Sequence, residues 1–444
     1  MKKIFTLLSA IFALTHLSAQ QYTIANWYKN KTACAVLTYD DWLDGHGAIA
    51  FDQFVSKGMV GTFYINADWA SNSGGYDTMT YGAKHGLEIA NHTFSHQDLQ
   101  LITLQESKDE IKSCLDSINK FVTNQKCLTF AYPFGNYTPD VVAYVKETHI
   151  AGRAARGNWM WGNNWVYDFA DPNANYSQIY EPYYEIPEYE VSDATSNTMI
   201  DAQMTNAKNN GGLLTFMFHE IYNNNVGNPS GWDAVTEQYH SDFLDLIKTY
   251  EDDFWIPTFV DAIKYHKERH CATLATVSNV PNLLTLSLTD TLYRNDIYNH
   301  PLTLSLNFAQ SAVVDSIVQG GNKLIGFTHS NGKLVFNAVP DGGDILVHKS
   351  GGSAVSKNTE ESLLKELFPN PVSSQLTLVM NSSMIGNYSL QLHNALGEMV
   401  YNQPLQFSGY SMQQVDMSGY SAGLYTLSII GENEQIERKI LKVD

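Results

Sequence analysis

Two adjacent carboxylates, a pair of histidines and a distant third histidine could together hold a metal ion and move protons. Asp40 and Asp41 are neighbours, His92 and His96 are separated by three residues, and His219 lies far downstream. Two neutral imidazoles and one carboxylate make a three-ligand site for zinc or a similar ion, with positions left for water. A second carboxylate could take a proton from the attacking water, and another histidine could protonate the leaving group.

Each feature taken alone has an ordinary structural explanation. A His-x3-His pair often arises by chance, and two aspartates after a strand can cap a helix. A lone histidine such as His219 can be buried in a core, where its ring donates to a backbone carbonyl. The placement of all these residues along the chain therefore has to decide between one site and several unrelated features.

Short apolar runs alternate with amphipathic stretches through residues 31–270. The runs predict strands at 33–39, 59–65, 87–91, 127–132, 149–155 and 213–218, and the other stretches predict helices at 48–58, 105–122, 138–149 and 239–252. This alternation indicates a parallel sheet, closed or nearly closed into a barrel. The candidate residues directly follow the first, third and last of these strands. Because carboxyl ends of parallel strands face the active site, we expect the side chains to meet there.

The composition limits the possible partners. The chain has 444 residues, long enough for two or three domains, and 46 acidic against 27 basic residues give a formal net charge of -19. Nucleic acid is an unfavourable partner because phosphate binding needs clustered Lys and Arg. With 44% hydrophobic residues the chain can bury a sizeable core.

The first 20 residues predict a secretory signal peptide. Lys2 and Lys3 precede an apolar stretch that ends near Ser18 and Ala19. A membrane anchor is disfavoured because the apolar run is shorter than the roughly 20 residues of a spanning helix, and no later stretch predicts a transmembrane segment. Export would allow the four cysteines at 34, 114, 127 and 271 to oxidise, in any of three pairings.

The pattern changes after residue 270. Apolar and polar residues alternate in 282–288, 302–308, 333–339 and 344–349, which predicts a small β-sandwich-like accessory domain over 271–348. Residues 349–364 are polar, contain Gly-Gly and predict a linker. A third unit of short strands occupies 365–444.

Five segments resemble the NodB-homology polysaccharide deacetylases, carbohydrate esterase family four. They are AVLTYDD, GTFYI, GLEIANHTFSHQDL, LTFAYPFGNY and LLTFMFHE, in matching order and spacing. The resemblance implies a distorted (β/α) barrel over residues 21–270 and metal-dependent removal of acetyl groups from sugars. By position it implies the following roles: Asp40 as base, Asp41, His92 and His96 as metal ligands, His219 as general acid, and the backbone N–H of Phe134 as an oxyanion donor.

The chain departs from this family in two places. The usual Arg-x-Pro-Tyr is Ala-Tyr-Pro-Phe at 131–134, so the arginine that supports the base is missing. Arg153 or Arg156 is a candidate to replace it. The turn after the two aspartates has Trp42 in place of glycine, so that Asp44 or His46 could enter the site.

Aromatic residues crowd the segment 158–189. Trp159, Trp161 and Trp165 could form a wall on which sugar rings stack, or could pack a long loop onto the barrel. The residues predicted to bind substrate are Tyr132, Pro133, Trp159, Trp161 and Arg156.

The last 80 or so residues resemble the C-terminal sorting domain of the type IX secretion system. LFPNPVSSQLTL opens this part of the chain and GLYTLSIIGENEQIERKILKV lies at its end. The resemblance implies export across the outer membrane, as a secreted or surface-attached protein. The alternative is a β accessory module that binds sugar.

Together these features predict a monomeric enzyme that deacetylates an acetylated polysaccharide with a divalent metal, most simply zinc, with cobalt or nickel also compatible. The alternatives are an inactive deacetylase-like protein that only binds polysaccharide, and a metal-dependent hydrolase of another amide. Neither the sugar nor the choice between N- and O-acetyl follows from the sequence.

Overall fold

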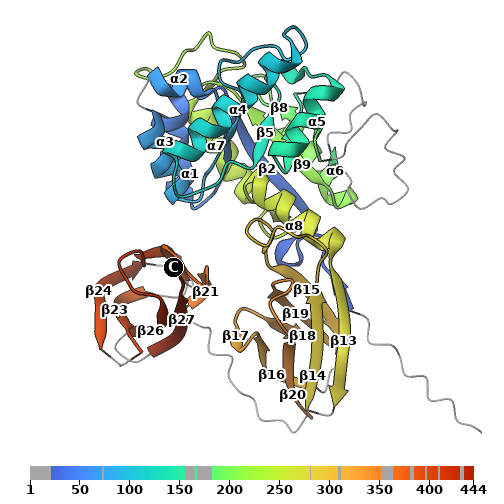
Figure 1. Cartoon of the computed structure of the whole chain (residues 1–444), viewed down its shortest axis with the longest axis vertical. Coiled ribbons are helices and arrows are strands. Elements are labelled where there is room, and N and C mark those ends of the chain that lie inside the picture. Colours follow the sequence, from blue (N-terminus) through green and yellow to red (C-terminus); the bar gives the residue numbers. More distant parts are fainter. Residues whose placement is uncertain are drawn as a thin grey trace, which may run out of the picture. The chain divides into compact units, whose positions relative to one another are not determined.

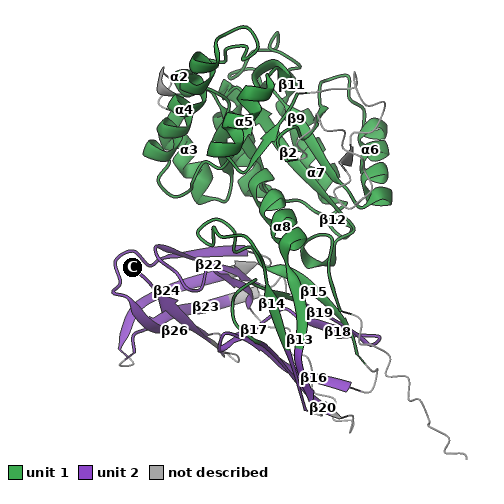
Figure 2. Cartoon of the chain, turned by 45° about the vertical axis from the view of Figure 1, so that its right-hand side comes forward, with its two compact units in different colours: residues 1–276, 286–308, 337–344 green, residues 277–285, 309–336, 345–444 purple. Residues whose placement is uncertain are grey.

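The computed structural model describes most of the chain beyond the predicted signal peptide. The described residues are 22–72, 75–155, 166–167, 183–280, 282–308, 312–351, 364–380, 385–395, 398–408, 411–430 and 435–444. They divide into two compact units, coloured separately in Figure 2. The first contains residues 1–276, 286–308 and 337–344, and the second contains 277–285, 309–336 and 345–444.

A parallel sheet forms the centre of the first unit (Figure 1). Its strands run in the order β6, β5, β4, β3, β2, β9 and β7, of which β7 is antiparallel to β9. Their bounds are β2 (Ala33–Asp40), β3 (Thr62–Ile65), β4 (Glu88–Asn91), β5 (Thr129–Ala131), β6 (Ala151–Arg153), β7 (Val166–Tyr167) and β9 (Leu213–Phe218). Every residue of β2, β3, β4 and β9 is buried, as expected for strands that are covered on both faces.

A segment absent from the predicted strands extends this sheet. β8 (Tyr189–Glu190) pairs in parallel with β9, and just before it Ile186 forms a parallel bridge with Arg153 of β6. The segment 186–190 therefore links the two sides of the sheet, and this confirms the predicted distorted barrel. β12 (Phe254–Trp255) adds a parallel pairing to β2.

Helices alternate with these strands and cover the sheet (Figure 1). They are α1 (Phe51–Lys57), α2 (Ala67–Asn72), α3 (Gly75–Lys84), α4 (Leu104–Phe121), α5 (Pro139–Thr148), α6 (Asn197–Asn210), α7 (Glu237–Lys248) and α8 (Phe259–Cys271), with short turns η1 (Tyr28–Asn30), η2 (His46–Ala50) and η3 (Pro133–Gly135). Local sequence sets their starts: Thr103 and Glu106 form a capping box on α4, and Thr138 caps α5, which begins with Pro139. Buried faces of α1, α3, α4, α6 and α7 pack with the sheet in one hydrophobic cluster, and α5 packs in a second cluster with Ile111 of α4 and Phe130 of β5.

The rest of the chain is antiparallel β-structure, which confirms its predicted all-β character. Its strands are β13 (Thr273–Val280), β14 (Leu283–Thr289), β15 (Leu302–Asn307), β16 (Ala312–Gln319), β17 (Asn322–Leu324), β18 (Thr328–Ser330), β19 (Lys333–Ala338) and β20 (Ile345–Gly351). Within unit 1, β1 (Tyr22–Ile24) pairs with β15, and within unit 2, β16 pairs with β17 and β20. The division between the units runs through β13, β14 and β19, so the predicted domain boundaries at 270 and 348 stay predictions.

The C-terminal part has two antiparallel sheets, β21-β22-β25 and β24-β23-β26-β27, around their own hydrophobic core. The bounds are β21 (Leu364–Phe368), β22 (Gln375–Met380), β23 (Ile385–His393), β24 (Met399–Ser408), β25 (Ser411–Asp416), β26 (Gly423–Ile430) and β27 (Gln435–Lys442).

The predicted signal peptide and most of the predicted linker lie outside the described residues. No helix in the described ranges is both long and apolar enough to cross a bilayer. The four cysteines are all present as thiols, three of them buried.

Candidate active site

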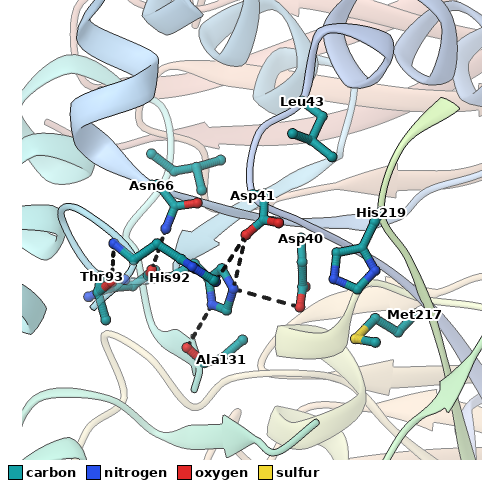
Figure 3. A network of polar contacts seen from close by, with 12 residues as sticks. Asp40, Asp41, Leu43, Asn66, His92, Thr93, Ala131, Met217 and His219 are labelled. Carbon is teal, nitrogen blue, oxygen red and sulfur yellow. Dashed lines mark hydrogen bonds and ion pairs between the residues drawn. The ribbon is translucent and has the colours of Figure 1, made fainter. Parts of the chain in front are cut away.

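The ends of three parallel strands bring the predicted site residues together (Figure 3). Asp40 is the last residue of β2, and β2 lies between β3 and β9. His92 directly follows β4, and His219 directly follows β9. All three strands run in the same direction, so their carboxyl ends open on one cavity. Asp40, His92 and His219, which are distant in sequence, thus line one cavity.

Asp41, His92 and His96 form a cluster that can hold a metal ion. Their ligand atoms all lie within 4.8 Å of one another. Nε2 of His92 is 3.4 Å and Nε2 of His96 is 3.3 Å from the same atom, Oδ1 of Asp41. That oxygen is buried and makes no hydrogen bond to the described residues. An orphaned carboxylate oxygen that faces two imidazole nitrogens fits a divalent cation of the zinc class.

Backbone contacts orient this cluster. Nδ1 of His92 donates to the carbonyl oxygen of Ala131 at 2.9 Å, which leaves Nε2 with its lone pair toward Asp41. Asn66 donates to the carbonyl oxygen of His92 at 2.7 Å. Asp41 and His96 have φ angles of 81° and 58°, a region that non-glycine residues seldom occupy. Such strained positions are typical of functional sites.

The charges of the cluster suit metal binding. Burial raises the pKa of Asp41, but His92 and His96 outweigh that effect and hold this pKa well below its usual range. Burial and the neighbouring His92 lower the pKa of His96 to about 4. The carboxylate is therefore ionised and the His96 ring is neutral near neutral pH, which is the form of each that binds metal.

Arg153 forms a buried ion pair with Asp40. The Nη2 atom of Arg153 donates to Oδ2 of Asp40, and the arginine is completely buried. Its guanidinium also lies 5.1 Å from the centre of the Tyr64 ring and donates to the sulfur of Met217 at 3.1 Å. Of the two arginines considered as a replacement for the one missing at Ala131, Arg153 contacts the carboxylate. Arg156 lies outside the described residues.

His219 lies beside a carboxylate and is fixed through its backbone. Its Nδ1 atom is 3.7 Å from Oε1 of Glu190, and burial lowers its pKa. Nε2 of the buried His46 donates to the carbonyl oxygen of His219 at 2.6 Å, while Nδ1 accepts from the Leu43 N–H. His46 thus supports the end of β9 and does not line the cavity. Asp44 is exposed and does not line the cavity either.

The site opens into a cavity of about 750 Å³. It is lined by Asp40, Asp41, His92, His96, Tyr132, Phe134, Ala155, Glu188, Tyr189, Glu190, Ser192, Ala194, Thr195, Met199, Met217, His219, Trp232 and Asp233.

Phe134 has a φ of 57°, and its ring packs edge-on against His96 with centroids 4.5 Å apart. Pro133 is buried and is not a wall residue. Trp159, Trp161 and Trp165 lie outside the described residues.

The sequence interpretation missed several residues of the cavity wall, among them Glu188, Glu190 and Trp232. Glu188 and Glu190 belong to the short segment that completes the barrel. Their spacing of two residues in the sequence, with Tyr189 between them, was the available sign of an extended segment. Trp232 lies in the loop 223–234, which is rich in Asn, Gly, Pro and Ser. A tryptophan among such residues could have been recognised as a binding residue because loops carry much of a protein's function.

Parts of the chain are similar to known proteins. Residues 28–152 match the family model described as polysaccharide deacetylase. A gellan lyase from Bacillus sp. is 22% identical over 351 residues, which cover 75% of this chain and 13% of that protein. The chain thus spans about an eighth of the length of this curated relative.

Two solved structures are similar to this chain over part of its length. The peptidoglycan deacetylase PdaC from Bacillus subtilis, as a mutant, is 16% identical, with 54% of this chain and 94% of that chain covered and a TM-score of 0.36. A wild-type family CE4 pseudoenzyme from Bacillus anthracis is 14% identical, with 53% and 66% covered and a TM-score of 0.34.

The C-terminal part has its own match. Residues 366–443 match the family model described as secretion system C-terminal sorting domain. A domain of this kind indicates export, with the protein secreted or placed on the cell surface. The chain therefore contains a polysaccharide deacetylase domain over residues 28–152 and ends in a secretion system sorting domain.

Proposed function

We propose that this protein is a hydrolase that removes acetyl groups from an acetylated polysaccharide with the help of a divalent metal. The observation that carries the proposal is the convergence of the Asp41, His92 and His96 ligand atoms beside Asp40 and His219 on one cavity wall. The acting unit is a monomer, because one chain supplies every residue of this set.

Asp41, His92 and His96 would hold the metal, most simply zinc. A cation bound there would lower the pKa of a water molecule and polarise the acyl carbonyl. Asp41 supplies the negative charge, and the Ala131 carbonyl keeps His92 in the tautomer that a ligand needs.

The remaining polar groups have separate roles. Asp40 accepts the proton of the attacking water, and the buried Arg153 keeps this carboxylate in place. The backbone N–H of Phe134 donates to the oxyanion that develops on the acetyl group. His219 then protonates the departing nitrogen or oxygen of the sugar. Tyr132 forms part of the wall around the acetyl group.

Acetate release from acetylated glycans tests this proposal. We expect Asp40→Asn to lower the rate by about 10²–10⁴-fold, because it removes a general base and retains the shape. A chelator should abolish release, and added zinc should restore it. Asp109→Asn, the same change at an exposed position of α4 away from the cavity wall, is the matched control. Equal rates for the wild type and Asp40→Asn would contradict the enzymatic proposal and leave a protein that only binds polysaccharide.

A further inference from the structure

The wall of the cavity beside His219 contains three carboxyl groups that the proposed reaction does not use. Glu188 comes two residues before Glu190, the last residue of β8 (Tyr189–Glu190), and both glutamates line the cavity. Asp233 and Trp232 come from the loop between β10 (Ile221–Tyr222) and β11 (Val235–Thr236). All four line the cavity.

Glu188 is a buried acid without a hydrogen-bond partner for one of its oxygens. The residue is 1% exposed, and its Oε2 atom makes no hydrogen bond to the described residues. Burial raises the pKa of Glu188 to about 8. A buried polar atom at a cavity is costly unless a ligand or water satisfies it. The position of Glu188 therefore indicates a donor on the ligand.

Trp232 presents a large apolar surface at the same wall. It is 69% exposed, although tryptophan is usually well buried. Its indole N–H donates to Oε1 of Glu190 at 2.7 Å, and its ring centre is 6.5 Å from that of His219. The hydrogen bond holds the indole beside the proposed general acid. A flat apolar ring held in this way can pack against the C–H face of a sugar.

The charges on the wall favour a cationic group. The wall residues of the described ranges include five carboxyl groups, at Asp40, Asp41, Glu188, Glu190 and Asp233, and no lysine or arginine. Arg153 pairs with Asp40 and also lowers the pKa of Glu188, an effect that burial outweighs, and the metal would compensate Asp41. Burial and the contact with Asp233 raise the pKa of Glu190 to about 7, as expected for crowded acids that lack a cation.

We propose that Glu188, Glu190 and Trp232 form a subsite for a sugar residue that carries a free amino group. Trp232 packs against the sugar ring, and the two glutamates bind the ammonium group. This inference rests on the proposed function, because it assumes a glycan in the cavity. It specifies the substrate as an amino-sugar polymer that is already partly deacetylated, and it disfavours glycans that carry carboxylates.

Calorimetric titration with two pentamers of the same β-1,4-linked backbone tests the subsite. One is built of glucosamine and the other of glucose, so that they differ only at carbon 2 and neither has an acetyl group to lose. We expect the wild type at about pH 6 to bind the glucosamine pentamer about tenfold more tightly or better, as for a hydrogen bond to a charged group. Proton release from the glutamates should make the binding heat depend on the buffer.

Substitutions separate the two parts of the subsite. Glu188→Gln and Glu190→Gln should each remove most of the preference for glucosamine, whereas Trp232→Ala should weaken both pentamers about equally. Trp232→Phe, which keeps a ring, should have a smaller effect than Trp232→Ala. Tyr293→Ala is the matched control, because Tyr293 is 97% exposed and is not a wall residue. Thermal unfolding of each variant checks that it is folded.

The outcomes separate this inference from the proposed function. Equal affinity for the two pentamers, or a preference that survives both glutamate substitutions, overturns the subsite even if acetate is released. A glucosamine preference that Glu188→Gln abolishes supports the subsite even if the wild type releases no acetate, and in that case only the enzymatic proposal fails.

Discussion

The buried guanidinium of Arg153 decides how Asp40 can act. An aspartate that is 2% exposed would be costly as an anion without a partner, and Arg153 supplies that partner from the end of β6. Arginine suits this position because its charge persists and its planar group also faces the ring of Tyr64. Ala131 lacks a side chain that could do the same.

Replacement of Arg153 should therefore impair catalysis more than substrate binding. We expect Arg153→Met to lower kcat for acetate release by at least about 10²-fold with little change in KM, because Asp40 would lose the group that holds it in place as general base. Arg153→Lys keeps the charge and should recover part of the loss. A rise in KM alone, with kcat unchanged, would show that Arg153 contacts substrate instead of positioning Asp40.

Metal binding at the Asp41 cluster should stabilise the fold. Zinc at a hundred times its dissociation constant should add about 2.7 kcal/mol to the free energy of unfolding of metal-free protein. His96→Gln removes one ligand and should abolish most of this gain, while Gln97→Ala, an exposed neighbour, should retain it. Thermal unfolding with and without zinc measures the effect. The same stabilisation of His96→Gln would place the metal elsewhere.

At the scale of elements, a buried glutamate connects three strands and a helix. Glu88 at the start of β4 accepts hydrogen bonds from Thr62 of β3 at 2.8 Å, from Thr129 of β5 and from the Val260 N–H of α8 at 2.8 Å. The residue is 5% exposed, and burial raises its pKa to about 7 despite these hydrogen bonds. The folded state therefore binds a proton more tightly than the unfolded state does.

This raised pKa predicts a loss of stability as the pH increases. The contribution of protonated Glu88 is fully present below its unfolded value of 4.5 and is lost as the pH rises through about 7. The loss is on the order of 3 kcal/mol. Glu88→Gln should remove this loss of stability. Urea unfolding at about pH 5 and about pH 8 measures the effect. The free energy of unfolding of the variant, relative to that of the wild type, should be higher at about pH 8 than at about pH 5. Glu251→Gln, at an exposed position, should show no such gain.

At the scale of the whole molecule, the proposed active site and the sorting domain match lie in different stretches of the chain. The described wall residues of the cavity all lie between 40 and 233, whereas the sorting domain match covers 366–443 and has a separate core. Nothing in the proposed reaction requires the C-terminal strands.

A chain that ends at residue 351 should therefore keep its acetate release within about twofold and lose its export. The measurement compares acetate release by the purified chains and their amounts in the culture medium. The full-length chain is the control. Secretion of the shortened chain at the full-length level would contradict a sorting role for residues 366–443.

The sequence by itself determined the order of strands and helices and the kinds of side chain at the strand ends. Local patterns suffice to predict these features, because a short apolar run predicts a buried strand such as β2 or β9. The residue that follows the run must then lie at the edge of the sheet. Asp41, His92 and His96 can be named in this way from their positions along the chain alone.

Only the tertiary structure decided which distant side chains complete the site. Arg153 reaches Asp40 across the barrel, and Glu188 and Glu190 enter the cavity because the segment 186–190 connects β6 to β9. That segment is short, contains proline and has no apolar run, so its pairing depends on the strands on either side of it. Contacts of this kind depend on barrel closure, which no local stretch of sequence encodes.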